Sequence, residues 1–256
     1  MVTLLHKFST PCASYRPMTN LIETLASSAH RYFFGFPSAN ARLIKPIAAL
    51  FSCVPLMAAA SDLSIKVFDL RGRPVLDAVV YVELTNKATA QPSPAPRSKS
   101  SEVEQRGRQF LPLVSVIQTG TSVNFPNNDT VRHHVYSFSP AKVFELKLYS
   151  GIAGRAIVFD KPGTAVLGCN IHDSMVAFIH IVETPWFAKT DSSGEARILS
   201  LPSGSYRLKA WHYALADQNS FPEQAVSVAG NETSTTITLD LKPFSLPAGA
   251  ATTTRQ

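Results

Sequence analysis

Three side chains that bind soft metals recur at every third position of one short stretch, namely Cys169, His172 and Met175. A tight loop there would aim a thiolate, an imidazole and a thioether at one point. Sulfur with imidazole nitrogen is the donor set that selects copper, and two His, one Cys and a weak axial Met form its electron-transfer version. The stretch therefore predicts a copper site that still needs one histidine.

The missing histidine is expected upstream, at His133 or His134. The two residues open a β-prone run that ends at Phe138, and a polar turn rich in Asn and Asp precedes them. For the site to close, this turn must reach the same pole of the fold as the Cys169 loop.

Together the two segments resemble the cupredoxins, the small blue copper proteins such as plastocyanin and amicyanin. In that family an Asn-rich turn delivers one His, and a Cys-x2-His-x2-Met loop or a slightly longer one delivers the other ligands. The resemblance covers residues 109–182 and implies one mononuclear type 1 copper ion. The ligands that it implies are His133, Cys169, His172 and Met175.

The chain departs from the family pattern at two positions. His134 stands where Asn usually follows the first ligand, so the choice between His133 and His134 is open. Asp173 stands where Pro often follows the loop histidine, which changes the surface that a partner would meet.

Short β-prone runs, separated by turn signals and without helical periodicity, surround both motifs. They predict an all-β fold, a Greek-key β-sandwich, which is also the architecture that the cupredoxin resemblance implies. The seven runs are residues 113–118, 122–125, 134–138, 144–148, 156–159, 164–168 and 176–182. The Cys169 loop would then join the last two strands at one pole.

A second β region follows residue 185, with Thr190-Asp191-Ser-Ser-Gly and Pro202-Ser-Gly-Ser-Tyr206 as its turns. These turns resemble the signatures of the carboxypeptidase-regulatory or prealbumin-like small β-sandwich. We interpret Asp191–Gly194 as a hairpin turn and not a calcium loop, because further carboxylates are missing.

Residues 63–84 read as two strands joined by a Gly/Pro turn, which predicts another hairpin. In the family that residues 190–206 resemble, such a hairpin comes directly before those turns. The resemblance therefore implies one domain split into residues 61–88 and 183–243, with a copper domain, residues 89–182, inserted into it. One enlarged sandwich is the alternative.

The first 60 residues read as a leader. Arg42 and Lys45 precede an apolar run, residues 46–57, and three alanines follow, which predicts a signal peptide cleaved near Ala60 and a periplasmic protein. An uncleaved signal anchor and a lipoprotein signal at Cys53 are the alternatives. The small polar residues at the other end predict a disordered tail, residues 244–256.

Cleavage would remove Cys12 and Cys53 and leave Cys169 as the one cysteine, so no internal disulfide is expected. A buried structural thiol is the plain alternative to a metal ligand. The formal charge of +6 is concentrated in the leader, since the residues after 60 carry 19 cations and 17 acids. No basic run is interleaved with aromatic residues, so neither nucleic acid nor, after cleavage, a membrane is predicted as a partner.

The sequence therefore predicts a periplasmic carrier of single electrons that is not an enzyme. Its partner would be a transiently bound redox protein, such as an oxidase, a dehydrogenase or a cytochrome, and the pattern also resembles methylamine-utilisation proteins. A copper delivery or storage protein, and a structural β-sandwich with a vestigial metal site, are the alternatives. His180, in mid-strand, is interpreted as a surface or satisfied histidine and His212 as structural.

Overall fold

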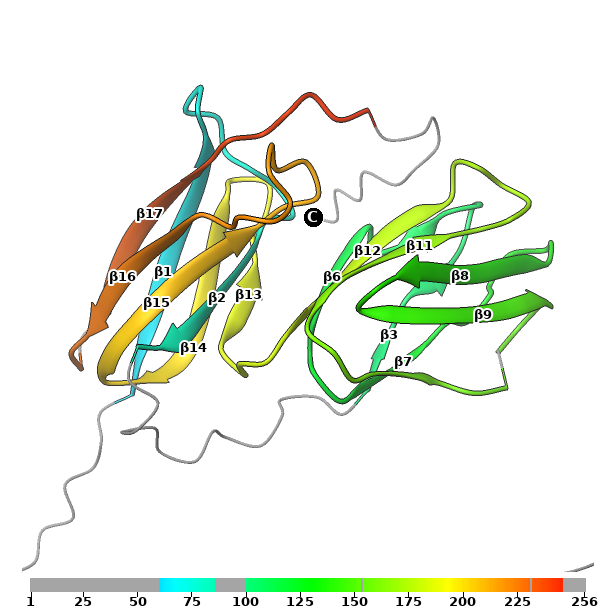
Figure 1. Cartoon of the computed structure of the whole chain (residues 1–256), viewed down its shortest axis with the longest axis horizontal. Helices are drawn as coiled ribbons and strands as arrows, with labels where there is room; N and C mark the ends of the chain where they lie inside the picture. The colour runs from blue at the N-terminus through cyan, green and yellow to red at the C-terminus, as the bar shows by residue number, and fades with distance from the viewer. Residues whose placement is uncertain (1–59, 86–99, 153, 231, 246–256) are drawn as a thin grey trace, which may run out of the picture. The chain divides into compact units, whose positions relative to one another are not determined.

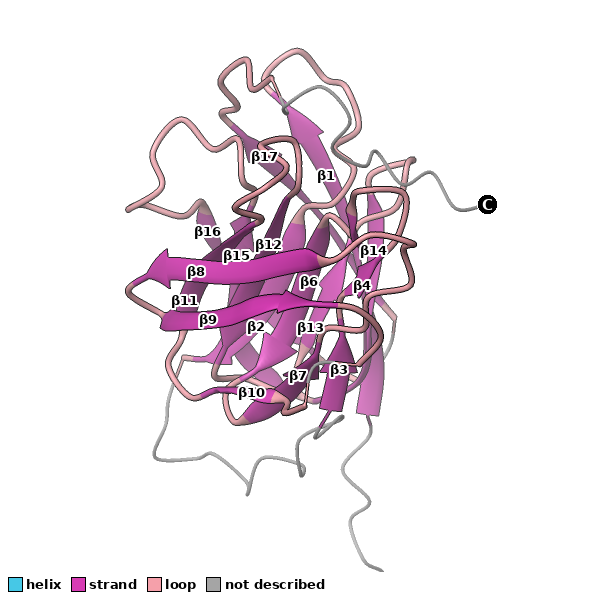
Figure 2. Cartoon of the chain, turned by 90° about the vertical axis from the view of Figure 1, so that its right-hand side faces the viewer, coloured by secondary structure: helices cyan, strands magenta, loops and turns pink. Residues whose placement is uncertain are grey.

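The computed structural model describes residues 60–85, 100–152, 154–230 and 232–245, and regular structure there consists of strands alone. The all-β prediction is confirmed over these ranges, and Figure 2 contains strands and loops only. The leader up to residue 59, the proline-rich segment 86–99 and the tail from residue 246 lie outside the described residues. The predictions made for them stay predictions.

Two facing sheets and a short ribbon form the region that carries the candidate ligands (Figure 1). The five-stranded sheet has the order β6-β12-β11-β8-β9, the three-stranded sheet has the order β10-β7-β3, and β4 pairs with β5. The strands are β3 (Ser100–Glu102), β4 (Glu104–Gln105), β5 (Phe110–Leu111), β6 (Val114–Gln118), β7 (Thr121–Asn124), β8 (His133–Ser139), β9 (Lys142–Tyr149), β10 (Ile157–Phe159), β11 (Gly163–Gly168) and β12 (Val176–Val182).

The core of this region follows from alternation along the strands. Ala165 and Leu167 on β11 are fully buried, whereas Val166 between them is exposed, as expected for side chains that alternate across a sheet. Inward residues of both sheets, among them Val123 and Phe159, join one apolar cluster. The seven predicted strands are present with ends moved by up to two residues, and the short β3, β4 and β5 are additional.

Two further sheets contain all the remaining strands of the described chain. Their orders are β14-β1-β17 and β13-β2-β15-β16. The strands are β1 (Ala60–Asp69), β2 (Val79–Leu84), β13 (Phe187–Lys189), β14 (Glu195–Pro202), β15 (Gly204–Trp211), β16 (Glu223–Val228) and β17 (Thr233–Leu239). A second apolar cluster fills the space between the two sheets, with Leu63, Ile65 and Leu208 among its fully buried members.

The predicted hairpin over residues 63–84 is wrong. β1 pairs with β14 and β17, whereas β2 lies between β13 and β15 in the other sheet. The turn itself forms, with the amides of Arg71 and Arg73 donating to the Asp69 carboxylate, but the chain then crosses to the second sheet. Alternation identifies strands and cannot choose their partners. The first four residues of β2 are all buried, so they show no alternation.

The turn at Asp191 also links two sheets and does not close a hairpin. Asp191 Oδ1 accepts hydrogen bonds from the amides of Ser193 and Glu195, and Gly194 has a left-handed φ of 74°. A turn was correctly predicted there. However, β13 before it and β14 after it pair with β2 and β1 respectively, so the hairpin part of the prediction is wrong.

Strand pairing separates the described chain into two sets of strands. Strands within residues 60–84 and 187–239 pair with one another, and strands within residues 100–182 do likewise. All of them nevertheless belong to one compact unit, and Val114 and Phe178 of the ligand region pack in the cluster of the other region. The prealbumin-like inserted-domain arrangement, residues 61–88 plus 183–243 around residues 89–182, stays a prediction.

Candidate metal centre

The loop between β11 and β12 brings Cys169, His172 and Met175 close together. β11 and β12 are antiparallel, and the last pair in their register is Gly168 with Val176. The seven residues between these two close the ladder, and the Met175 amide donates to the His172 carbonyl at 3.0 Å. The loop is therefore a tight turn anchored on a central strand pair.

His133 reaches this loop because β8 lies next to β11. The two strands pair at Tyr136 and Gly168. Since they run in opposite directions, the start of β8 lies beside the end of β11 and the loop that follows it. His133 opens β8 and is fully buried, with Nδ1 3.9 Å from Cys169 Sγ.

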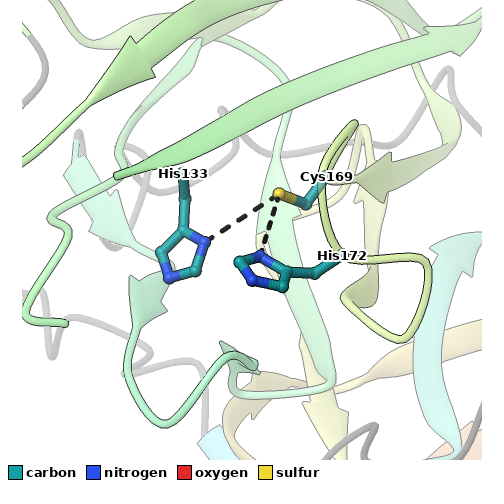
Figure 3. A group of neighbouring side chains, drawn as sticks. All are labelled: His133, Cys169 and His172. Carbon is teal, nitrogen blue, oxygen red and sulfur yellow. Dashed lines mark hydrogen bonds between the residues drawn. The ribbon is translucent and has the colours of Figure 1, made fainter. Parts of the chain in front are cut away.

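His172 completes a cluster of three candidate ligands. Its Nδ1 also lies 3.9 Å from Cys169 Sγ, and one ligand atom from each of His133, Cys169 and His172 falls within 4.8 Å of the others. Figure 3 shows both imidazoles turned toward the sulfur. Within the described residues, this is the group of His, Cys, Asp and Glu side chains placed to hold a metal ion.

The separations fit a single bound ion. Metal–sulfur and metal–imidazole bonds of about 2.3 and 2.0 Å add up to more than 3.9 Å, so one ion can bond Cys169 and either histidine at once. One thiolate with two imidazoles suits copper, whereas harder ions prefer oxygen. The cluster thus offers the donor set of a copper site.

His133 lies beside Cys169, and His134 does not. Neighbouring residues of a strand point to opposite faces, and the ring of His134 instead lies near Glu145, with Nε2 3.0 Å from Oε1. That contact is close enough for an ion pair but is not aligned as a hydrogen bond, and Nε2 has no other partner. The position favours His133 as the ligand, and the assignment itself stays a prediction.

Met175 is buried at the same end of the core. Only 2% of its surface is exposed, and it belongs to the apolar cluster that contains Cys169. Both residues also line a surface pocket of about 460 Å³. Its side chain is therefore near the cluster, and its role as an axial ligand stays a prediction.

Asp129 contacts the candidate ligand His133 and was not predicted from the sequence. Its Oδ2 lies 2.6 Å from His133 Nε2, on the side of the ring opposite Nδ1, and its two oxygens accept hydrogen bonds from the amides of Gly107 and Arg108. Burial raises the pKa of this carboxyl, but the hydrogen bonds from Arg108, His133 and Gly107 outweigh burial and the pKa is lowered. An Asp four residues before a candidate His ligand was the available signal.

Hydrogen bonds from Asn127 and Tyr149 hold the turn that precedes His133 in place. Asn127 donates from Nδ2 to the carbonyls of Val131 and Tyr149, at 2.9 and 2.8 Å. Tyr149 OH donates to the Phe125 carbonyl, and burial raises the pKa of this phenol to about 12. The Asn-rich turn is thus held to β9 by side chains that cannot move without breaking partly buried hydrogen bonds.

His172 is the more accessible of the two histidines. It is half-buried, whereas His133 is fully buried. Burial lowers the pKa of His172, the neighbouring His133 and Arg108 lower it further, and the Asp129 carboxylate acts in the opposite direction. A neutral His172 is the form that can bind a metal.

The other two predicted histidines lie outside this cluster. His180 on β12 is only 1% exposed, and its ring stacks on Trp211 with centroids 4.5 Å apart, so it is not a surface histidine. Its Nδ1 lies 3.0 Å from Thr164 Oγ1, as the alternative of a satisfied histidine expects. The alternation along β12 correctly predicted that His180 faces away from Ile179 and Ile181. It could not reveal that Trp211 covers that face. Burial lowers the pKa of His180 to about 3. His212 accepts a hydrogen bond from the Ala214 amide, as a structural residue would.

In the parts of the chain that the structure describes, no helix is both long and apolar enough to span a membrane. No protein-family model matches the chain. No curated protein matches it either.

Several solved structures have partial likeness to the chain. A novel purple cupredoxin from Nitrosopumilus maritimus is 22% identical, with a TM-score of 0.27 over 32% of this chain and 99% of that one. A reduced amicyanin mutant is 13% identical, with a TM-score of 0.31 over 40% of this chain and 99% of that one. A copper-containing nitrite reductase from Thermus scotoductus is 24% identical, with a TM-score of 0.31 over 46% of this chain and 28% of that one.

Proposed function

We propose that the protein carries single electrons on one type 1 copper ion held by His133, Cys169, His172 and Met175. The observation that supports this most is the placement of Cys169 Sγ at 3.9 Å from Nδ1 of both His133 and His172. When bound, copper supplies a one-electron couple between Cu(II) and Cu(I). No covalent chemistry on a substrate is needed, and we propose no enzymatic activity.

In this proposal the chain holds its ligands still while the charge of the site changes. His133 and Cys169 are 0% and 3% exposed, and both are anchored at the ends of paired strands. Met175 would supply the weak fourth donor, which together with the apolar surroundings of the sulfur would set the potential. A site that is rigid in both states needs little rearrangement, which favours fast electron transfer.

Electrons would enter and leave through His172. Ile171 next to it and Val131 in the turn before β8 are exposed apolar residues. Arg132 of that turn and Arg108 of the turn between β4 and β5 are exposed cations. A small apolar contact with a basic rim suits a transient complex with an acidic redox protein. We propose a periplasmic oxidase, dehydrogenase or cytochrome as that partner.

Copper delivery is the competing function, because the same ligands would serve it. The burial of Cys169 and His133 argues against it, since a delivery site must open to an acceptor protein. Comparing the rate of electron self-exchange with the rate of copper release to a chelator separates the two functions. We expect self-exchange within milliseconds to seconds and release over hours. Release faster than self-exchange would contradict the proposal.

A further inference from the structure

The Asp129 carboxylate connects the candidate centre to a hairpin tip outside the family motif. Oδ2 contacts His133 Nε2 at 2.6 Å and accepts from the Arg108 amide at 2.9 Å, while Oδ1 accepts from the Gly107 amide at 2.6 Å. Gly107 and Arg108 come from the turn between β4 and β5, more than 20 residues earlier in the chain. Three donors thus converge on one carboxylate.

The hairpin tip has a backbone conformation suited to this contact. Arg106 and Gln109 exchange two backbone hydrogen bonds, and φ is 63° at Gly107 and 58° at Arg108. Two central residues with positive φ define a type I′ turn. L side chains rarely adopt that conformation, so Arg108 is held in a strained state beside the candidate centre.

Asp129 is also held in place by residues of its own turn. Its amide donates to Asn127 Oδ1 at 3.0 Å, and Asn127 is bonded in turn to Val131 and Tyr149. The Asp129 side chain is 13% exposed. The carboxylate therefore keeps one orientation, with one oxygen against the ring of His133.

We infer that Asp129 is a positioning residue that fixes the tautomer and the donor strength of His133. A carboxylate at Nε2 keeps the proton on that nitrogen and leaves the Nδ1 lone pair directed toward Cys169. Its negative charge, passed through the ring, favours the more highly charged oxidised ion and so lowers the reduction potential. The inference rests on the proposed copper function and adds a residue to it.

Asp129→Asn tests this, because Asn keeps the shape and an acceptor oxygen but loses the charge. Asp160→Asn is the matched control, since Asp160 is a 59% exposed carboxylate whose partner is Lys142. We expect Asp129→Asn to bind Cu(II) about 10–100-fold more weakly than the wild type and to have a higher reduction potential by voltammetry. The control should match the wild type in both measurements.

Nitrogen NMR of His133 in the metal-free protein gives a readout that a purely structural role would not move, because no metal ion there fixes the position of the ring proton. The wild type should carry its proton on Nε2, in slow exchange with water, and in Asp129→Asn that proton should exchange faster and be shared with Nδ1. If Asp129→Asn fails to fold, the wild-type spectrum still decides, because a proton on Nδ1, or fast exchange at Nε2, would overturn the inference.

The failure of the inference is distinguishable from the failure of the proposed function. A wild type with a blue copper site, together with an Asp129→Asn variant of unchanged potential and affinity, overturns the inference alone and leaves Asp129 as a loop anchor. A wild type that binds no copper overturns both.

Discussion

Cys169 Sγ and His133 Nδ1 lie 3.9 Å apart although 36 residues separate them in the chain. The strand register produces this proximity, because Tyr136 of β8 pairs with Gly168 of β11 and the two strands are antiparallel. A slip by one residue would turn His133 to the opposite face of the sheet. The candidate centre thus depends on one strand pair being formed correctly.

Replacing His133 and His134 one at a time by glycine tests which of the two is the ligand. His133→Gly should remove the visible band of the Cu(II) protein, and added imidazole should restore it by filling the space of the lost ring. His134→Gly should keep the band, because its ring faces Glu145. Absorption spectra with and without imidazole provide the measurement, and loss of the band in His134→Gly alone would reverse the assignment.

Met175→Leu tests the axial position. Leu conserves most of the buried volume, so the free energy of unfolding should fall by less than about 1.5 kcal/mol. Removing the weak sulfur donor should keep the Cys169 band and raise the reduction potential, because the thioether stabilises the oxidised ion. Voltammetry of both proteins checks this, and an unchanged potential would remove Met175 from the ligand set.

The basic rim near His172 should control reactions with charged oxidants. Arg108→Glu should slow oxidation of the Cu(I) protein by hexacyanoferrate(III), an anion, and speed oxidation by hexaammineruthenium(III), a cation. Both effects should shrink as salt is added. The matched control is Arg207→Glu on β15. It replaces an arginine whose side chain is 51% exposed and which lies in a different sheet. Equal effects of both variants would place electron exit elsewhere.

Gly168 is required by the ring of Tyr136. A Cβ atom at Gly168 would lie 2.7 Å from Tyr136 Cζ, which is closer than real Cβ contacts allow. Gly168→Ala should therefore cost about 1–3 kcal/mol and broaden the copper spectrum by moving Cys169. Adding Tyr136→Leu should recover part of the loss, as chemical denaturation of the double-mutant cycle would measure. Strict additivity would argue against the contact.

His180 should make the metal-free protein less stable in acid. Burial lowers its pKa from 6.5 to about 3, so the unfolded chain takes up this proton first as pH falls. Stability present above pH 6.5 is then lost between pH 6.5 and about 3, by at most about 1.4 kcal/mol per pH unit. Denaturant unfolding at a series of pH values in this range gives the free energy of unfolding of the wild type and of His180→Leu. This free energy should fall less steeply with falling pH in the variant than in the wild type. Identical slopes would show that His180 does not titrate.

The candidate ligands could be predicted from the sequence because their donor atoms are unusual and their spacing is local. Cys169, His172 and Met175 are close for any tight loop, and β8 was expected to start near His133. Asp129 was not predicted, since a single carboxylate in a polar turn looks like an ordinary turn residue. Its importance depends on Gly107 and Arg108, which the fold brings to it from another strand pair.

The strand partners of the second region could not be predicted in the same way. Alternation in residues 63–69 and 79–84 gave two correct strands and a wrong hairpin, because periodicity carries no information about which edges pair. The surface position expected for His180 was wrong for a related reason, since the aromatic ring that covers this histidine comes from β15. Contacts between distant segments were the part of the fold that local patterns left undetermined.

The absorption spectrum of the Cu(II)-loaded protein, recorded beside that of Cys169→Ser, tests the central claim most directly. We predict an intense visible thiolate-to-copper band at one copper per chain in the wild type and its disappearance in Cys169→Ser. A colourless wild type, or a band that survives in Cys169→Ser, would contradict a copper centre built on Cys169.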